Sequence, residues 1–187
     1  MTCSAVHPAD AAQGPQETEN DENAKPPQGA TEANSETKKQ TMDKSYKGPL
    51  PELTAEQILV RDELRRDVRM LAEEIGERNL RRYEKLVQAA EFIAKSLVEA
   101  GYERVERQTY EVRGRKCDNL EVELPGTEHA DEIVVVGGHY DSVEGTPGAN
   151  DNASGAAAML ALARRFAERK CGRTLRFVAW VNEEPPY

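Results

Sequence analysis

The chain has 187 residues, a formal net charge of −9, and a hydrophobic content of 38%. This length is sufficient for one hydrophobic core, and an acidic chain without a basic stripe argues against nucleic acid as the main partner. No apolar run approaches the roughly 20 residues that a membrane-spanning helix needs, so the sequence predicts no membrane span.

The first fifty residues contribute little to a core. They are rich in Pro, Gly, Asn, Gln, Ser, Thr, Glu and Lys, and apart from the first Met their large apolar residues are Val6, Met42, Tyr46 and Leu50. So little apolar area does not offset the entropy of ordering the chain. We therefore expect residues 1–50 to be a disordered polar tail and residues 51–187 to fold.

The cysteines and the N-terminus bear on the compartment. Cys3, Cys117 and Cys171 are scattered without a CxxC pair, which predicts free thiols rather than a disulfide framework or a thiolate zinc site. The N-terminus lacks the cationic and then apolar pattern of a signal peptide, so the sequence as given predicts a cytoplasmic protein. If the true start lies upstream, the protein could instead be secreted, or be a lipoprotein, which Cys3 before a long polar tether would suit.

Two helices are predicted at the start of the folded part. Thr54 and Gln57 form a capping-box pair, and Gly76 suits the end of this first helix. The second helix is predicted at about 80–100, with Gly101 after it. Apolar residues recur on one face of each helix: Leu64, Val68, Leu71 and Ile75 in the first, and Tyr83, Leu86, Ala90, Ile93 and Leu97 in the second.

The hydrophobic period then changes to that of strands. Residues 104–113 and 117–124 are predicted to form two strands joined by a turn around Gly114. Residues 132–137 are an almost purely apolar run, which is typical of a strand buried on both faces of a sheet.

A strand–helix–strand unit follows from this apolar run. An Ala- and Leu-rich helix is predicted at about 153–169, and another buried strand at 174–181. This order implies a right-handed βαβ unit. The predicted fold class is α/β: an incomplete three-layer α/β/α sandwich with a mostly parallel sheet, preceded by the two helices.

Polar residues follow the ends of the two parallel strands. His139 follows one strand and Glu183 follows the next, while Asp151 stands at the start of the intervening helix. Ligands bind beyond the carboxyl ends of parallel strands. We therefore expect these three residues to converge at one edge of the sheet.

These residue types can hold metal ions and move a proton. His139 and Asp141 are two apart on an extended segment, so the imidazole can bind a metal while the carboxylate accepts its other N–H. Asp151 lies where a carboxylate could bridge two ions. Glu183 and Glu184 point to different sides, so one can be a ligand and the other a general base.

Three motifs resemble the zinc peptidases of metallopeptidase family 28, which includes bacterial and vacuolar aminopeptidases. They are Gly-His-Tyr-Asp-Ser at 138–142, Pro-Gly-Ala-Asn-Asp-Asn-Ala-Ser-Gly at 147–155, and Arg-Phe-Val-Ala-Trp-Val-Asn-Glu-Glu at 176–184. The resemblance covers roughly residues 55–187. It implies aminopeptidase-type hydrolysis of a peptide substrate with two zinc ions.

The resemblance also implies a role for each site residue. His139 would bind the first zinc, with Asp141 as the partner that orients it. Asp151 would bridge both zinc ions. Glu184 would bind the second zinc, and Glu183 would be the general base. A cis peptide bond is expected between Asp151 and Asn152.

The sequence given departs from the family pattern after the Glu-Glu pair. The family has two further ligands there, an Asp and a His, and this sequence supplies neither. We therefore regard it as C-terminally truncated and expect the 187-residue chain to be inactive by itself. The strand at 174–181 is expected to expose apolar faces.

Two alternatives stay open. The chain could be a non-catalytic degenerate fragment or an interaction module that another chain completes, and its oligomeric state is not predicted. It could also be a glutaminyl-cyclase-like acyltransferase, because these enzymes share the fold. Their loop, however, lacks the Asn-Asp-Asn-Ala-Ser-Gly motif of residues 150–155.

Overall fold

The computed structural model describes residues 48–185. Most of the polar tail predicted at 1–50 lies outside the described residues, as does Cys3. Within the described part, Cys117 and Cys171 are free thiols, as predicted. No helix in that part has the length and apolar character needed to cross a membrane.

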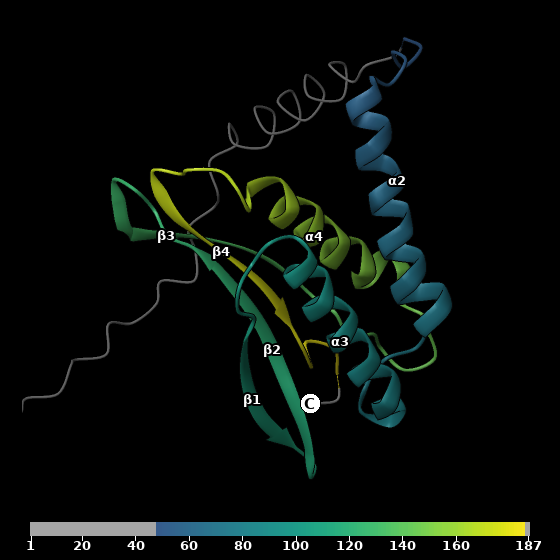
Figure 1. Ribbon diagram of the computed structural model, residues 1–187. Helices are drawn as coiled ribbons and strands as arrows, with labels where there is room; N and C mark the ends of the chain where they lie inside the picture. Colours follow the sequence, from purple (N-terminus) through teal and green to yellow (C-terminus); the bar gives the residue numbers. More distant parts are fainter. Residues whose placement is uncertain (1–47, 186–187) are drawn as a thin grey trace, which may run out of the picture. The chain divides into compact units, whose positions relative to one another are not determined.

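Two helical segments come first, as predicted (Figure 1). Helix α2 (Ala55–Arg69) begins with the predicted capping box, in which the Thr54 and Gln57 side chains accept each other's backbone N–H. It continues into the π-helical turn η1 (Met70–Ile75) and ends at Gly76, whose φ of 82° suits a residue without a Cβ. The 3-10 turn η2 (Leu80–Arg82) leads into helix α3 (Tyr83–Glu99).

A hairpin follows the helices. Strands β1 (Glu106–Val112) and β2 (Arg115–Leu124) pair antiparallel. Arg113 and Gly114 connect them and both have positive φ, which matches the right-handed twist of hairpin strands. A two-residue turn can join only antiparallel neighbours.

The βαβ unit comprises strand β3 (His129–His139), helix α4 (Ser154–Phe166) and strand β4 (Arg173–Trp180). The crossover places β4 between β2 and β3, so the described strands have the order β1-β2-β4-β3. The α/β class is confirmed. The sheet is mixed rather than mostly parallel, because only the β3–β4 pair of these strands is parallel.

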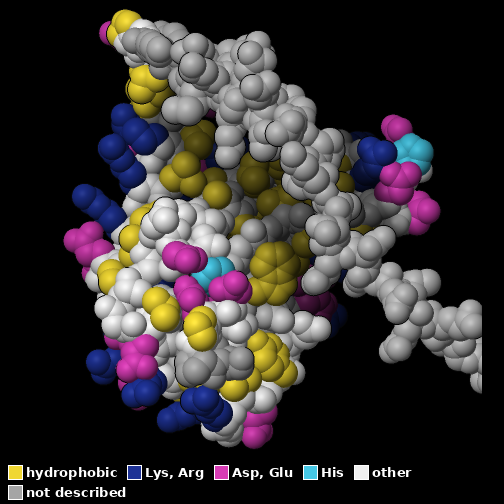
Figure 2. Space-filling view, turned by 180° about the vertical axis from the view of Figure 1, so that it is seen from behind, with side chains coloured by type: hydrophobic (Ala, Val, Ile, Leu, Met, Phe, Trp, Pro, Cys, Tyr) yellow, Lys and Arg dark blue, Asp and Glu magenta, His cyan; other side chains and the backbone are white. Residues whose placement is uncertain are grey.

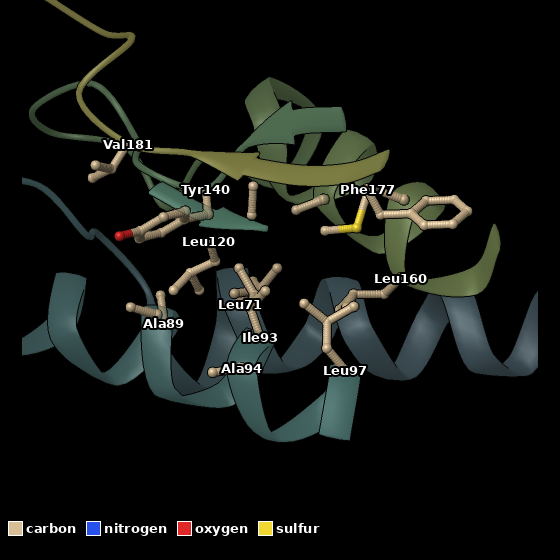
Figure 3. Close-up of a cluster of buried hydrophobic side chains, with 14 of the residues drawn as sticks. Leu71, Ala89, Ile93, Ala94, Leu97, Leu120, Tyr140, Leu160, Phe177 and Val181 are labelled. Atoms are coloured by element: carbon tan, nitrogen blue, oxygen red, sulfur yellow. The ribbon is translucent and has the colours of Figure 1, made fainter. Parts of the chain in front are cut away.

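The described core lies between the sheet and its helices. The labelled helices all lie on one side of the sheet (Figure 1). Figure 3 shows aliphatic residues of α3 and α4 facing Leu120, Tyr140 and Phe177. The described residues therefore form two of the three predicted layers.

The apolar run on β3 is not buried on both faces, contrary to the prediction. Ile133, Val134 and Val135 are 42% to 51% exposed, because β3 lies at one edge of the described sheet. Residues 174–181, which we expected to expose apolar faces, are covered by neighbours on both sides, although Trp180 remains 39% exposed. Of these two strands, β3 therefore exposes more apolar surface than β4.

Candidate metal centre

The parallel pairing of β3 and β4 places their carboxyl ends side by side. His139 is paired with Trp180 in the strand register, and the N–H of Tyr140 donates to the Trp180 carbonyl over 2.9 Å. The segments that leave the two strands therefore start at the same edge of the sheet. One carries Asp141 and the other carries Glu183 and Glu184, as the strand-end argument predicts.

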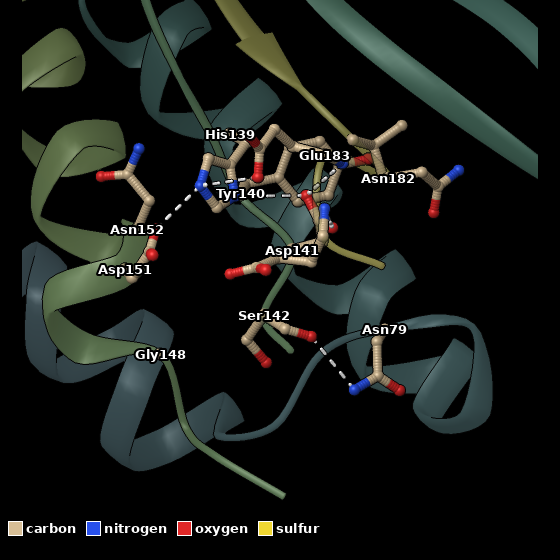
Figure 4. Close-up of polar contacts among 12 residues, drawn as sticks. Asn79, His139, Tyr140, Asp141, Ser142, Gly148, Asp151, Asn152, Asn182 and Glu183 are labelled. Carbon is tan, nitrogen blue, oxygen red and sulfur yellow. Dashed lines mark hydrogen bonds and ion pairs between the residues drawn. The ribbon is translucent and has the colours of Figure 1, made fainter. Parts of the chain in front are cut away.

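His139 is the buried centre of the cluster (Figure 4). Its Nε2 atom lies 2.9 Å from Asp151 Oδ1 and 3.6 Å from Glu183 Oε2. Its Nδ1 atom lies 3.4 Å from Asp141 Oδ1 but has no well-aligned hydrogen-bond partner among the described residues. Both ring nitrogens thus face carboxylates. Nε2 faces the exposed Asp151 and Glu183, and Nδ1 faces the buried Asp141.

Asp141 also fixes the backbone of the two glutamates. This fully buried carboxylate accepts the N–H of Glu183 at Oδ1 over 3.3 Å and the N–H of Glu184 at Oδ2 over 3.1 Å. One side chain therefore lies against the imidazole and holds the segment after β4. The sequence predicted the contact between Asp141 and the imidazole, but not its hydrogen bonds to the backbone of Glu183 and Glu184.

The loop before α4 delivers Asp151. Gly148 adopts the left-handed conformation with φ of 57°, and the turn η3 (Ala149–Ala153) follows it. The peptide bond between Asp151 and Asn152 is cis, as the resemblance implies. The Asn152 carboxamide accepts the N–H of Gly155 over 2.8 Å, which fixes the start of α4 beside the site.

The site concentrates negative charge. Side-chain atoms of His139, Glu183 and Glu184 that can bind a metal lie within 4.8 Å of one another. The pKa of Glu184 is raised above its ordinary value, first by desolvation and then by the charge of Asp151 and Glu183. Figure 2 shows a histidine among acidic side chains on this face. A bound cation would relieve this repulsion.

The spacing of these groups fits a zinc ion. Two atoms that each lie about 2.1 Å from one tetrahedral ion are about 3.4 Å apart. The distances from His139 Nε2 to the Asp151 and Glu183 carboxylates, 2.9 Å and 3.6 Å, lie on either side of this value. Imidazole and carboxylate groups are ordinary zinc ligands, so the residues present are chemically suited to the metal.

All five predicted site residues lie at this edge. Asp151 contacts His139 but is not one of the three residues whose ligand atoms lie within 4.8 Å of one another. The Asp151 and Glu183 side chains are 73% and 61% exposed, so both face solvent at the mouth of the site. Which carboxylate binds a metal and which acts as a base stays a prediction.

Sequence reasoning missed the residues that support the site. Arg78 is fully buried, and its backbone N–H donates to Ser142 Oγ over 3.1 Å. The Asn79 carboxamide donates to the Ser142 carbonyl over 3.1 Å (Figure 4). In the sequence, Arg78 stands in a short charged stretch and is indistinguishable from a solvated surface residue.

A second support holds the exit of β4. Tyr110 donates its hydroxyl to the Val181 carbonyl over 2.7 Å and accepts from the Asn182 carboxamide over 3.3 Å. Asn182 has a φ of 59°, a conformation that asparagine tolerates better than most residues. This turn directs Glu183 toward the imidazole.

Comparison with known proteins agrees with this geometry. Residues 119–186 match the sequence model of Peptidase family M28. Uncharacterized protein YfbL of Escherichia coli (strain K12) is 31% identical over 134 residues, which cover 67% of this chain and 41% of that protein. Aminopeptidase YwaD of Bacillus subtilis (strain 168) is 47% identical over 53 residues, which cover 28% of this chain and 12% of that protein. The chain thus spans less than half the length of these curated relatives.

Solved structures show the same fold. A zinc aminopeptidase from Bacillus subtilis superposes with a TM-score of 0.58 at 14% identity, covering 65% of this chain and 61% of that one. The glutaminyl cyclase of Fimbriiglobus ruber superposes with a TM-score of 0.57 at 23% identity, covering 75% of this chain and 50% of that one. The motifs, the strand-end cluster and the sequence match agree, and the segment 119–186 of this chain belongs to peptidase family M28.

Proposed function

We propose that this chain carries part of the co-catalytic dizinc site of an aminopeptidase-type zinc peptidase. The observation that carries the proposal is the convergence of His139, Asp151, Glu183 and Glu184 at the carboxyl ends of β3 and β4. In this scheme His139 and Asp151 would hold one ion, and Asp151 and Glu184 would hold the other.

The protein residues have separate tasks in the proposed hydrolysis. Glu183 takes a proton from the attacking water and passes it to the leaving amine of a peptide substrate. Asp141 orients His139 and holds the backbone of Glu183 in reach of the site. Zinc, when bound, would lower the pKa of the attacking water and polarise the scissile carbonyl.

Zinc binding by the purified chain is the direct test. We expect zinc titration with a competing chelator to show binding that His139→Ala abolishes. His129→Ala is the matched control, because His129 is a partly exposed histidine at the opposite end of the same strand. Equal zinc affinity in the unmodified chain and in His139→Ala would contradict the metal site.

A second pair of variants distinguishes the roles of Glu183 and Glu184. Glu184→Gln should weaken zinc binding, because it removes a charged ligand. Glu183→Gln should leave zinc binding within about twofold of the unmodified chain, because the base does not hold the metal. The reverse pattern would exchange the two roles.

We further propose that these 187 residues bind zinc without peptidase turnover. The scheme gives each ion two protein ligands, fewer than the three or more of ordinary catalytic zinc sites. Hydrolysis of leucine p-nitroanilide with added zinc should stay at the blank rate. Zinc-dependent turnover that Glu183→Gln removes would show that the residues present suffice.

A glutaminyl-cyclase-like acyltransferase is the second candidate, because solved cyclase structures below 25% identity share the fold of this chain. Release of ammonia from a peptide with an N-terminal glutamine would favour the cyclase over the peptidase. A non-catalytic interaction module predicts neither reaction and no zinc binding.

A further inference from the structure

Arg78 is a fully buried cation whose guanidinium group bonds to backbone carbonyls. The segment between η1 and η2 carries it. Its nitrogen atoms donate to the carbonyl groups of Leu71, Gly76, Tyr140, Pro147 and Gly148. A buried charge is costly unless hydrogen bonds replace its hydration, and the guanidinium fork offers five donors in one plane.

The charge persists at neutral pH. Burial lowers the pKa of Arg78 to about 10, and the negative charge of Asp141 opposes this lowering. The guanidinium therefore stays protonated at pH 7, so all of its N–H donors remain available to the carbonyl groups around it.

The carbonyl groups bound by Arg78 belong to the segments that carry the site. Tyr140 stands between His139 and Asp141, and Gly148 begins the turn that carries Asp151. The Arg78 backbone adds two contacts with the first of these segments. Its N–H donates to Ser142 Oγ over 3.1 Å, and its carbonyl accepts the Ser142 N–H over 2.9 Å.

We infer that Arg78 is a positioning residue for the metal centre, which ties the segment after β3 to the loop before Asp151. It thereby fixes the separation of His139 from Asp151, although it touches neither. This inference rests on the proposed function, because it assigns Arg78 to the zinc site proposed above. A lysine cannot replace it, since a compact ammonium on a flexible stem cannot reach carbonyls of several segments at once.

Arg78→Lys tests this role, with Arg164→Lys as the matched control. Arg164 is a largely buried arginine on α4 that pairs with Asp67, so its replacement perturbs packing without touching the site segments. Co²⁺ titration followed by visible absorption reports both the affinity and the geometry of the metal site. Circular dichroism selects a temperature at which both variants are folded.

We expect Arg78→Lys to bind Co²⁺ at least tenfold more weakly, with an altered visible spectrum. Arg164→Lys should keep the affinity of the unmodified chain within twofold and its spectrum unchanged. A folded Arg78→Lys variant with unchanged affinity and spectrum would overturn the inference while leaving the proposed metal site intact.

A measurement on the unmodified chain decides the question if Arg78→Lys does not fold. Coupling between two sites is reciprocal, so a residue that positions the metal site must itself be stabilised by the metal. Zinc should slow amide hydrogen exchange at residues 71–79 as well as 140–148, and leave residues 55–59 at the exposed start of α2 unchanged. Zinc binding without slower exchange at 71–79 would overturn the role of Arg78. A lack of zinc binding would instead overturn the proposed function, and the inference with it.

Discussion

Gly138 of β3 and Gly155 of α4 lie back to back, so close that a Cβ on Gly138 would stand 2.9 Å from the carbonyl carbon of Gly155. This contact brings the start of α4 against the strand that ends in His139. The contact favours the short separation between the Asp151 and His139 side chains, because Asp151 precedes Gly155 by only four residues. Two residues without side chains thus allow the two functional side chains to come this near.

Gly138→Ala should therefore destabilise the fold. The added methyl group meets backbone atoms that cannot rotate away, and overpacking of this kind costs about 1–3 kcal/mol. Urea unfolding followed by circular dichroism measures the loss. Gly172→Ala is the control, because its Cβ would meet nothing nearer than 3.8 Å and its stability should change little. An equal effect of both substitutions would contradict the close contact.

Asp141→Asn should weaken zinc binding by roughly 10- to 100-fold, the usual effect of losing the partner that orients a ligating histidine. The N–H groups of Glu183 and Glu184 bond to separate oxygens of Asp141, and a carboxamide has an NH2 donor in place of one of them, so one of the two hydrogen bonds is lost. Zinc titration checks the affinity. Asp131→Asn, on the exposed start of β3, should bind zinc as the unmodified chain does.

Asp67 should be important for stability rather than for the site. It is fully buried on α2 and pairs with Arg164 of α4 over 2.6 Å, so Asp67→Asn leaves a mostly buried arginine without its counter-ion. Removing one partner of a buried pair costs about 3–5 kcal/mol. The free energy of unfolding in urea tests this.

The control for Asp67 is Asp62→Asn. Asp62 pairs with Arg61 over 2.8 Å, but both side chains are exposed. Exposed pairs contribute little to stability, so this variant should unfold at nearly the same urea concentration as the unmodified chain. Equal losses of unfolding free energy in Asp67→Asn and Asp62→Asn would contradict the prediction that the buried pair stabilises the fold more than the exposed pair.

Glu184 gives a pH dependence with a defined sign. Its pKa is raised in the folded chain, chiefly by desolvation and then by Asp151, so ionisation of Glu184 disfavours folding. The contribution of protonated Glu184 to the stability of the fold is fully present below the ordinary carboxyl pKa. It is lost as the pH rises through the raised pKa of Glu184 in the folded chain. Glu184→Gln should therefore raise the melting temperature of the metal-free chain more at pH 7 than at pH 4.

Calorimetry in the presence of a chelator measures this difference. Glu103→Gln, an exposed glutamate after α3, should show no such difference between the two pH values. With saturating zinc the order should reverse at pH 7, because the unmodified chain gains stability from the bound metal and Glu184→Gln gains less. A Glu184→Gln variant that is no more stable than the unmodified chain at pH 7 without metal would contradict the charge repulsion.

The local pattern of the sequence determined the elements and the strand-end cluster. The capping box of α2 and the apolar face of α3 depend on residues close together in the sequence, so a local motif and periodicity predicted them. The order strand, helix, strand predicted the βαβ unit. Convergence of His139 with Glu183 followed from one topological rule for parallel strands.

Only the tertiary structure decided the strand order, the exposure of β3 and the support of the site. The crossover put β4 between β2 and β3, which left the apolar run of β3 at an edge of the described sheet. Arg78 meets Tyr140 and Gly148 from positions 62 and 70 residues away. Contacts at such separations depend on how whole elements pack, and the local pattern around a charged residue is the same whether packing leaves it in solvent or buries it.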